Sequence, residues 1–215
     1  MDTILKKIIE AGIQAPSGEN SQPWHFKIEK NKIYIYNDPT MDTSPYNYKQ
    51  HSALITHGCL IENMLLAARA LQYSADFKIL PDKNDKNLIA IATINPANNS
   101  VADLYKSIWQ RCTNRKAYKS IPLEPKHRQT LLNGVLDLRQ ATIKFTEDKD
   151  SIKTLAAVGA TNEEIVFENK ELHTFLFKHN NWSKEEEQRN PGFYIETLEL
   201  PPPIKMLFKI IKFWP

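Results

Sequence analysis

Two short segments of this chain carry the side chains best suited to binding a polar ligand. The first lies between a predicted helix and an aromatic-rich strand and contains Pro16 and three polar side chains: Ser17, Asn20 and Gln22. Hydroxyl and amide groups both donate and accept hydrogen bonds, so this set can hold the edge of a flat polar heterocycle. Gly18 would let the ligand approach the backbone closely. The alternative interpretation is an ordinary polar loop.

The second segment places two arginines on either side of a hydroxyl group, as Arg111, Thr113 and Arg115. Guanidinium groups present forked donors that match phosphate oxygens, and the threonine hydroxyl adds a short donor between them. The pattern therefore predicts a phosphate-binding site. Taken alone, it is also typical of a solvated basic turn, so its interpretation depends on the first segment.

Together, the two segments resemble the FMN-dependent nitroreductase family. The first is similar to the family's A-P-S-x-x-N-x-Q-P-W pattern nearly letter for letter, and the second is similar to its R-x-S/T-x-R pattern. The resemblance implies that Arg111, Thr113 and Arg115 bind the FMN phosphate. It also implies that the four side chains of the first segment contact the ribityl chain or the ring edge. It assigns no catalytic side chain, because the flavin carries the redox chemistry.

The order of the two segments is similar to that of one subfamily, the Acg-type nitroreductases, in which two nitroreductase-like halves on one chain mimic a dimer. In other nitroreductases the arginines precede the first helix, whereas here they follow an entire first unit. The resemblance implies a first half at residues 1–97 and a second, incomplete half at 98–215. The family segment that faces the flavin N5 would lie beyond Pro215, so the chain looks C-terminally short.

The elements that must position these segments follow from hydrophobic periodicity. Helical spacing predicts helices over 3–14, with Asp2 as its N-cap, and over 51–72. Alternating patterns predict four strands, at 25–29, 32–36, 75–80 and 88–94. We therefore expect an α+β protein of nitroreductase-like fold, with a mixed, mostly antiparallel sheet flanked by helices.

The remainder of the chain has weaker signals. Residues 95–101 read N-P-A-N-N-S-V and predict a linker. Beyond it we expect one strand at 142–145 and four helices, at 102–110, 126–137, 150–158 and 161–179.

The end of the chain predicts one more helix, from Ile204, that carries a strongly apolar stripe among three lysines. Such a helix can lie on a membrane surface, but we expect it to pack on its own domain or on a partner subunit. One alternative that the sequence leaves open is an interaction module that forms a homodimer through this apolar helix.

Composition excludes several classes of function. The 215 residues, 41% hydrophobic and 25% charged, are typical of a globular protein, and a net charge of +3 is too small to indicate nucleic-acid binding. The two cysteines and six histidines lack metal-ligand spacing, so we expect no metal site. With no predicted membrane span or signal peptide, we expect a cytoplasmic protein with free thiols.

The function expected from these observations is that of an FMN-dependent oxidoreductase, which takes a hydride from NAD(P)H as a transient reductant. The electrons would pass to a small acceptor such as a nitroaromatic or a quinone. Because the resemblance places part of the flavin site beyond the chain, two alternatives stay open. The protein could bind or sequester flavin without catalysis, or it could be a remnant of the fold that has lost the cofactor.

Overall fold

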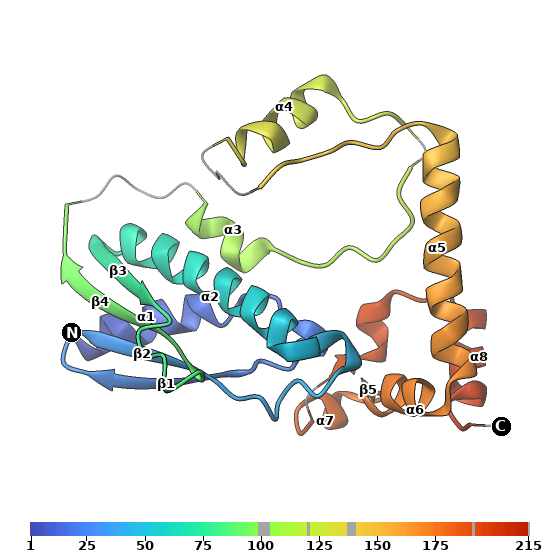
Figure 1. Cartoon of the computed structure of the whole chain (residues 1–215), viewed down its shortest axis with the longest axis horizontal. Helices are drawn as coiled ribbons and strands as arrows, with labels where there is room; N and C mark the ends of the chain where they lie inside the picture. Colours follow the sequence, from blue (N-terminus) through green and yellow to red (C-terminus); the bar gives the residue numbers. More distant parts are fainter. Residues whose placement is uncertain (99–103, 120, 137–140, 191, 215) are drawn as a thin grey trace.

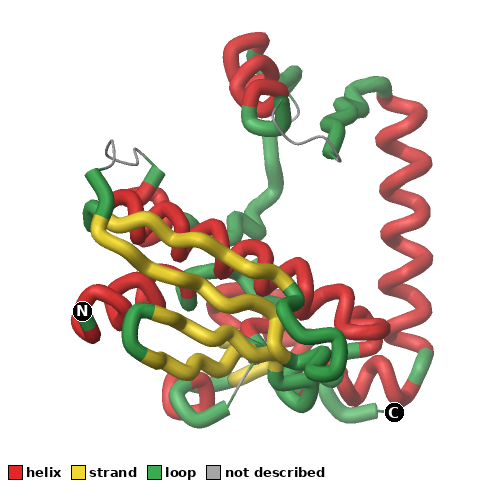
Figure 2. The backbone as a smooth tube through the Cα atoms, turned by 60° about the vertical axis from the view of Figure 1, so that its left-hand side comes forward, coloured by secondary structure: helices red, strands yellow, loops and turns green. Residues whose placement is uncertain are grey.

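The computed structural model describes residues 1–98, 104–119, 121–136, 141–190 and 192–214. Its first unit is a four-stranded antiparallel sheet with two helices on one face (Figures 1 and 2). The strands lie in the order β1-β2-β4-β3, and β1 and β2 form the hairpin that the sequence predicts. The bounds of these elements are α1 (Asp2–Gly12), β1 (Trp24–Glu29), β2 (Lys32–Asn37), α2 (His51–Ala70), β3 (Tyr73–Ile79) and β4 (Leu88–Pro96).

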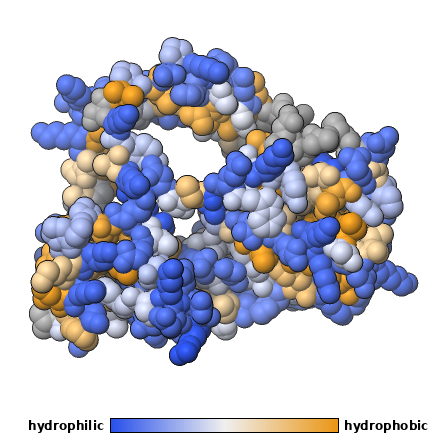
Figure 3. Space-filling model, turned by 180° about the vertical axis from the view of Figure 1, so that it is seen from behind, coloured by the Kyte–Doolittle hydropathy of each residue, from blue (hydrophilic) through white to orange (hydrophobic). Residues whose placement is uncertain are grey.

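The second part of the chain is mostly helical and less closely packed. An arm that contains α4 and α5 extends away from the sheet, and Figure 3 shows an open space between this arm and the rest of the molecule. Two short strands, β5 and β6, pair in parallel. The bounds are α3 (Tyr105–Gln110), α4 (Pro125–Asn133), α5 (Lys149–Glu168), α6 (Lys170–Lys178), β5 (Asn180–Asn181), α7 (Lys184–Glu187), β6 (Phe193–Tyr194) and α8 (Pro202–Ile211).

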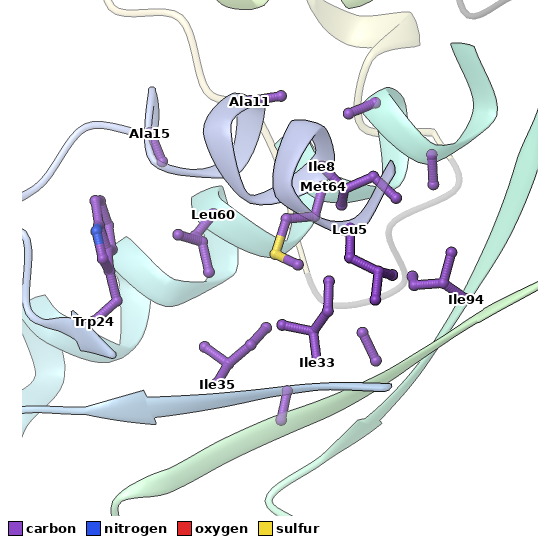
Figure 4. Packing of buried hydrophobic residues seen from close by; sticks show 14 of the residues in the cluster. Leu5, Ile8, Ala11, Ala15, Trp24, Ile33, Ile35, Leu60, Met64 and Ile94 are labelled. Atoms are coloured by element: carbon purple, nitrogen blue, oxygen red, sulfur yellow. The ribbon is translucent and has the colours of Figure 1, made fainter. Parts of the chain in front are cut away.

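The core lies between the sheet and the two helices α1 and α2 (Figure 4). Side chains alternate between the two faces of a strand, so Ile33 and Ile35 of β2 point to the same face and are fully buried. Gly12 allows α1 to approach α2 closely, because a Cβ atom there would lie 2.7 Å from Met64 Cγ. The largest fully buried core side chains are Leu5, Ile8, Ile33, Ile35, Leu60, Met64 and Ile94.

The position of α3 bears on the predicted division at residue 97. Ile108 of α3 belongs to the core of the first unit, and Tyr105 packs against that core. This contact brings the chain back to the sheet unit immediately before the arginines. The division into residues 1–97 and 98–215 stays a prediction, and so does the interpretation of the two parts as halves of a pseudo-dimer.

Three local predictions differ from the structure: the N-cap of the first helix, the strand at 142–145 and the start of the linker at residue 95. Met1 is the N-cap of α1, and Asp2 lies inside its first turn, where a negative charge is favourable toward the helix dipole. Residues 142–145 form no strand, because a strand needs a paired neighbour and none of the described ladders includes these residues. Asn95 and Pro96, predicted to be linker, extend β4 and pair with β3; residues 99–101 lie outside the described residues.

The predicted break between two helices near residue 160 is also wrong. One helix, α5, continues through that position to Glu168, and the break falls at Asn169. The Asn169 side chain accepts hydrogen bonds from the backbone N–H groups of Glu171, at 3.0 Å, and Leu172, at 3.1 Å. An asparagine that satisfies two free N–H groups makes a strong start for α6.

The helix α8 is attached to α6 through one face only. His173 Nε2 donates a hydrogen bond to the Ile211 carbonyl at 2.8 Å, and Phe208 packs with Phe177 at 5.5 Å between ring centroids. The opposite face exposes large apolar side chains: Met206, Ile210 and Phe213 are 69%, 64% and 70% exposed. The expectation that the apolar stripe packs on its own domain is therefore correct for one face of α8.

Within the described part of the chain, no helix combines the length and apolar character that crossing a membrane requires.

Candidate functional site

A cavity of about 430 Å³ opens between the end of α1 and the second part of the chain. This volume lies within the range of roughly 300–1,000 Å³ that is usual for small-molecule sites. The structure brings both predicted segments to this cavity, although they are far apart in the sequence. All the predicted site residues line it: Pro16, Ser17, Asn20, Gln22, Arg111, Thr113 and Arg115.

The first segment forms a tight polar loop at residues 17–22. Ser17 Oγ accepts a hydrogen bond from the Gln22 backbone N–H at 3.0 Å, and Gln22 Nε2 donates to Asn20 Oδ1 at 3.3 Å. Glu19, Asn20 and Gln22 have φ angles of 50°, 55° and 48°, a region that side-chain-bearing residues seldom adopt. Such a conformation persists only where the surrounding contacts hold it. The loop therefore presents its polar side chains in one defined arrangement.

Gly18 lies where the polar loop meets the rest of the first unit. A Cβ atom at this position would lie 2.9 Å from both Asp42 Oδ2 and Ser52 Oγ. The space that a side chain would need is thus occupied by the protein itself. The glycine lets the loop pack against the rest of the first unit, and it also lines a second cavity beside Pro16 and Ser17.

The second segment begins where α3 ends. Arg111 is the C-cap of α3, and its Nη2 donates to the Gln14 carbonyl at 3.4 Å. Arg115 Nη1 donates to the Thr197 carbonyl at 3.2 Å, and its guanidinium carbon lies 5.0 Å from the centre of the Phe193 ring. Each guanidinium carries five N–H donors, so these contacts orient the arginines and leave further donors for a ligand.

The structure adds cavity residues that the sequence motifs did not predict. Phe193, Tyr194 and Thr197 line the cavity from β6 and the turn after it, and Glu187 lines it from α7. The sequence signal that could have found this wall is Gly192, which precedes the aromatic pair. Its φ angle is 119°, and a Cβ atom there would lie 2.3 Å from the His179 carbonyl oxygen, so only glycine fits.

The charged side chains that line the cavity include two arginines and one glutamate. The guanidinium groups of Arg111 and Arg115 and the carboxylate of Glu187 line it together. Glu199 is engaged outside the lining, since its carboxylate accepts the Arg115 backbone N–H at 3.2 Å and lies 3.4 Å from Lys116 Nζ. The arginine end of the cavity thus suits a ligand group with negative charge and several acceptor oxygens, such as a phosphate.

A second cavity, of about 350 Å³, shares Pro16 and Ser17 with the first. Its other walls are largely aromatic and apolar and include Tyr46, His51 and Ile55. Tyr46 and Ile55 are 60% and 71% exposed, so this cavity is open to solvent. The loop at residues 17–22 therefore stands between a polar cavity and a more apolar one.

Comparison with known proteins gives no matching family model, but it finds several relatives. A putative NAD(P)H nitroreductase of Mycobacterium tuberculosis is 23% identical over 121 residues, which are 55% of this chain and 35% of that protein. The putative NAD(P)H nitroreductase Acg of the same organism is 24% identical over 95 residues, covering 44% of this chain and 29% of its own. This chain is related to the nitroreductase-like superfamily. It spans about a third of the length of these nitroreductase relatives.

Two further matches concern a longer stretch of sequence and a solved structure. An uncharacterized protein of M. tuberculosis is 24% identical over 194 residues, 90% of this chain and 27% of that protein. The crystal structure of a putative nitroreductase in complex with FMN from Desulfovibrio desulfuricans is 21% identical, with a TM-score of 0.37, and the match covers 53% of this chain and 87% of that one.

The structure bears directly on the predicted class of fold. The prediction of an α+β protein with an antiparallel sheet flanked by helices is confirmed. The expectation of a mixed sheet is wrong, because the four-stranded sheet is wholly antiparallel and the parallel pair β5–β6 forms a separate sheet of two short strands. In this nitroreductase-like chain the sheet unit supplies the polar loop, and the second part supplies the arginines and the aromatic wall.

Proposed function

We propose that this chain is an FMN-binding oxidoreductase. The observation that supports this most directly is the convergence of the two predicted segments on one cavity. The donor set fits the cofactor: Arg111, Thr113 and Arg115 suit a phosphate dianion, because charged forks and a hydroxyl can bind several of its oxygens. Ser17 and the amides of Asn20 and Gln22 suit the hydroxyl groups of a ribityl chain or the polar edge of a heterocycle.

In this proposal the protein binds, orients and shields the cofactor and contributes no catalytic side chain of its own. The cofactor supplies the redox chemistry: acceptance of a hydride from NAD(P)H and donation of electrons to a nitroaromatic, a quinone or a similar acceptor. The more apolar cavity beyond Pro16 and Ser17 suits a flat aromatic acceptor. We place the reaction in the cytoplasm, a reducing compartment that suits the free thiols Cys59 and Cys112.

The proposal is tested by cofactor retention and turnover. The purified chain is incubated with FMN and desalted, and its absorbance is recorded. We expect flavin bands at about 370 and 450 nm, and oxidation of NADH or NADPH when a quinone or nitroaromatic is added. Retained flavin without turnover would favour a flavin-binding protein without catalysis. A colourless protein that cannot be reloaded would refute the proposal and leave a fold without its cofactor.

We also propose that the exposed face of α8 joins two copies of the chain. Met206 and Ile210 of α8 and Phe213 just after it are exposed apolar side chains, and burying them against a second copy would remove them from water. Replacing Ile210 by glutamate should convert a dimer to a monomer in light scattering coupled to size exclusion. Leu80→Glu, at a 55% exposed leucine elsewhere, is the matched control and should leave the dimer intact. An Ile210→Glu chain of unchanged mass would rule this dimer out.

A further inference from the structure

A small cavity of about 10 Å³, the size of one water molecule, lies behind the loop that lines the proposed FMN site. Its walls bring the loop together with the segment after β2 and the end of α6: Glu19, Ser21, Met41, Asp42, Thr43 and His179. Asp42 is 4% exposed, and the side chain of Glu19 is 18% exposed. A buried carboxyl group and a half-buried one therefore line the same small cavity.

Asp42 lies directly against the loop. Its Oδ2 would be 2.9 Å from a Cβ atom at Gly18, the residue before Glu19, and its Oδ1 accepts the Ser44 backbone N–H at 3.1 Å. Burial and the neighbouring Asp42 charge raise the pKa of Glu19 to about 7. Since two like charges in a buried site repel, one of the pair is more stable with its proton bound.

Of the other polar residues at this cavity, neither His179 nor Ser21 makes a hydrogen bond to Glu19. His179 Nδ1 donates to the Phe175 carbonyl at 2.8 Å, and it is 4.0 Å from Glu19 Oε2, too far for a hydrogen bond. Ser21 Oγ is buried and has no hydrogen-bond partner among the described residues, so it can still pair with a protonated carboxyl group or a single water.

We propose that Glu19 is a positioning residue of the proposed FMN site, whose neutral carboxyl group holds loop 17–22 against Asp42 and the end of α6. The inference rests on the proposed function. Loss of the proton places two carboxylates together and loosens a loop whose backbone is already strained at Glu19 and Asn20. Asn20 and Gln22 line the cofactor cavity and follow Glu19 closely in the chain. A looser loop would therefore position these two side chains less well and weaken FMN binding.

The first experiment measures FMN affinity from pH 6 to pH 8 by quenching of flavin fluorescence. We expect the natural chain to bind FMN about tenfold more weakly at pH 8 than at pH 6, a usual size for coupling between sites. Glu19→Gln keeps a neutral side chain of the same shape, so its affinity should stay flat over this range. Glu10→Gln, at an exposed glutamate of α1, is the matched control and should follow the natural chain. A Glu19→Gln chain with the natural pH dependence would overturn the inference.

The second experiment uses the chain without FMN, so it separates this inference from the proposed function. A raised pKa means that the folded state holds a proton which the unfolded state has released, so this contribution to stability falls as the pH rises from about 4.5 to about 7. Glu19→Gln should therefore melt at a higher temperature than the natural chain at pH 8, and the difference should vanish near pH 4.5. Equal melting temperatures at pH 8 would reject the role of Glu19, whatever FMN does. A difference at pH 8 in a chain that never binds FMN would support the Glu19 contact and reject the FMN site.

Discussion

Replacing Arg111 and Arg115 together by alanine is expected to weaken FMN binding by a factor of roughly 10² to 10⁴. Both guanidiniums line the cavity, and each would donate charge-assisted hydrogen bonds to the phosphate. A hydrogen bond to a charged group contributes about 1.5–3 kcal/mol, so two such losses amount to about 3–6 kcal/mol. The measurement is a fluorescence titration of FMN against each purified protein. Far-UV circular dichroism checks that the double variant is folded.

Arg128→Ala is the matched control for this prediction. Arg128 pairs with Glu147 and lies 4.3 Å from the centre of the Phe145 ring, and it does not line the cavity. Its loss should leave the affinity for FMN unchanged. A further variant, with lysine in place of both arginines, keeps the positive charge but loses the forked donors, and should bind with intermediate affinity. An Arg111→Ala/Arg115→Ala chain that is folded and binds FMN as tightly as the natural one would disprove this phosphate site.

The second large effect is expected at Leu60, in the centre of the core. Leu60 is fully buried on α2, where it packs in the cluster between α1 and the sheet. Leu60→Ala should lower the free energy of unfolding by about 2–5 kcal/mol, because it removes buried apolar surface and leaves a cavity. Since whole domains are stable by only about 5–15 kcal/mol, this loss is readily measured by urea denaturation.

Ile55→Ala, on the same helix, is the matched control. Ile55 is 71% exposed, so its truncation should change the free energy of unfolding by less than about 0.5 kcal/mol. Both substitutions place alanine in α2. The difference between their changes in the free energy of unfolding therefore reports mainly the effect of burial and not that of helix propensity. Equal midpoints for the two variants would mean that Leu60 is not part of a close-packed core.

Hydrophobic periodicity predicted the sheet unit well, because its elements are marked by local patterns. The alternation of Ile33 and Ile35 with polar neighbours indicates a strand with one buried face, and the structure has them fully buried. The hairpin turn at Lys30 and Asn31 and the long helix from His51 likewise follow from short stretches of sequence.

The second part of the chain was predicted less well, and the errors have a common cause. Residues 142–145 have the composition of a strand but no paired neighbour in the described sheets. The helix break was expected near Gly159 and falls at Asn169, because a glycine is tolerated inside a helix whereas the Asn169 side chain caps the next one. Pairing partners and capping bonds depend on geometry that a periodicity pattern does not contain.

The sequence by itself determined the hydrogen-bonding capacity and charge of the side chains proposed for the candidate site, because these properties belong to residue types. Tertiary structure alone decided that the Ser17 loop and the arginines share a cavity, and that Thr197 and Phe193 hold Arg115 in place. It also decided that Glu19 is half-buried near Asp42, and both its burial and the Asp42 charge raise the pKa of Glu19. These properties arise from desolvation and from contacts between residues far apart in the chain, and both exist only once the chain has folded.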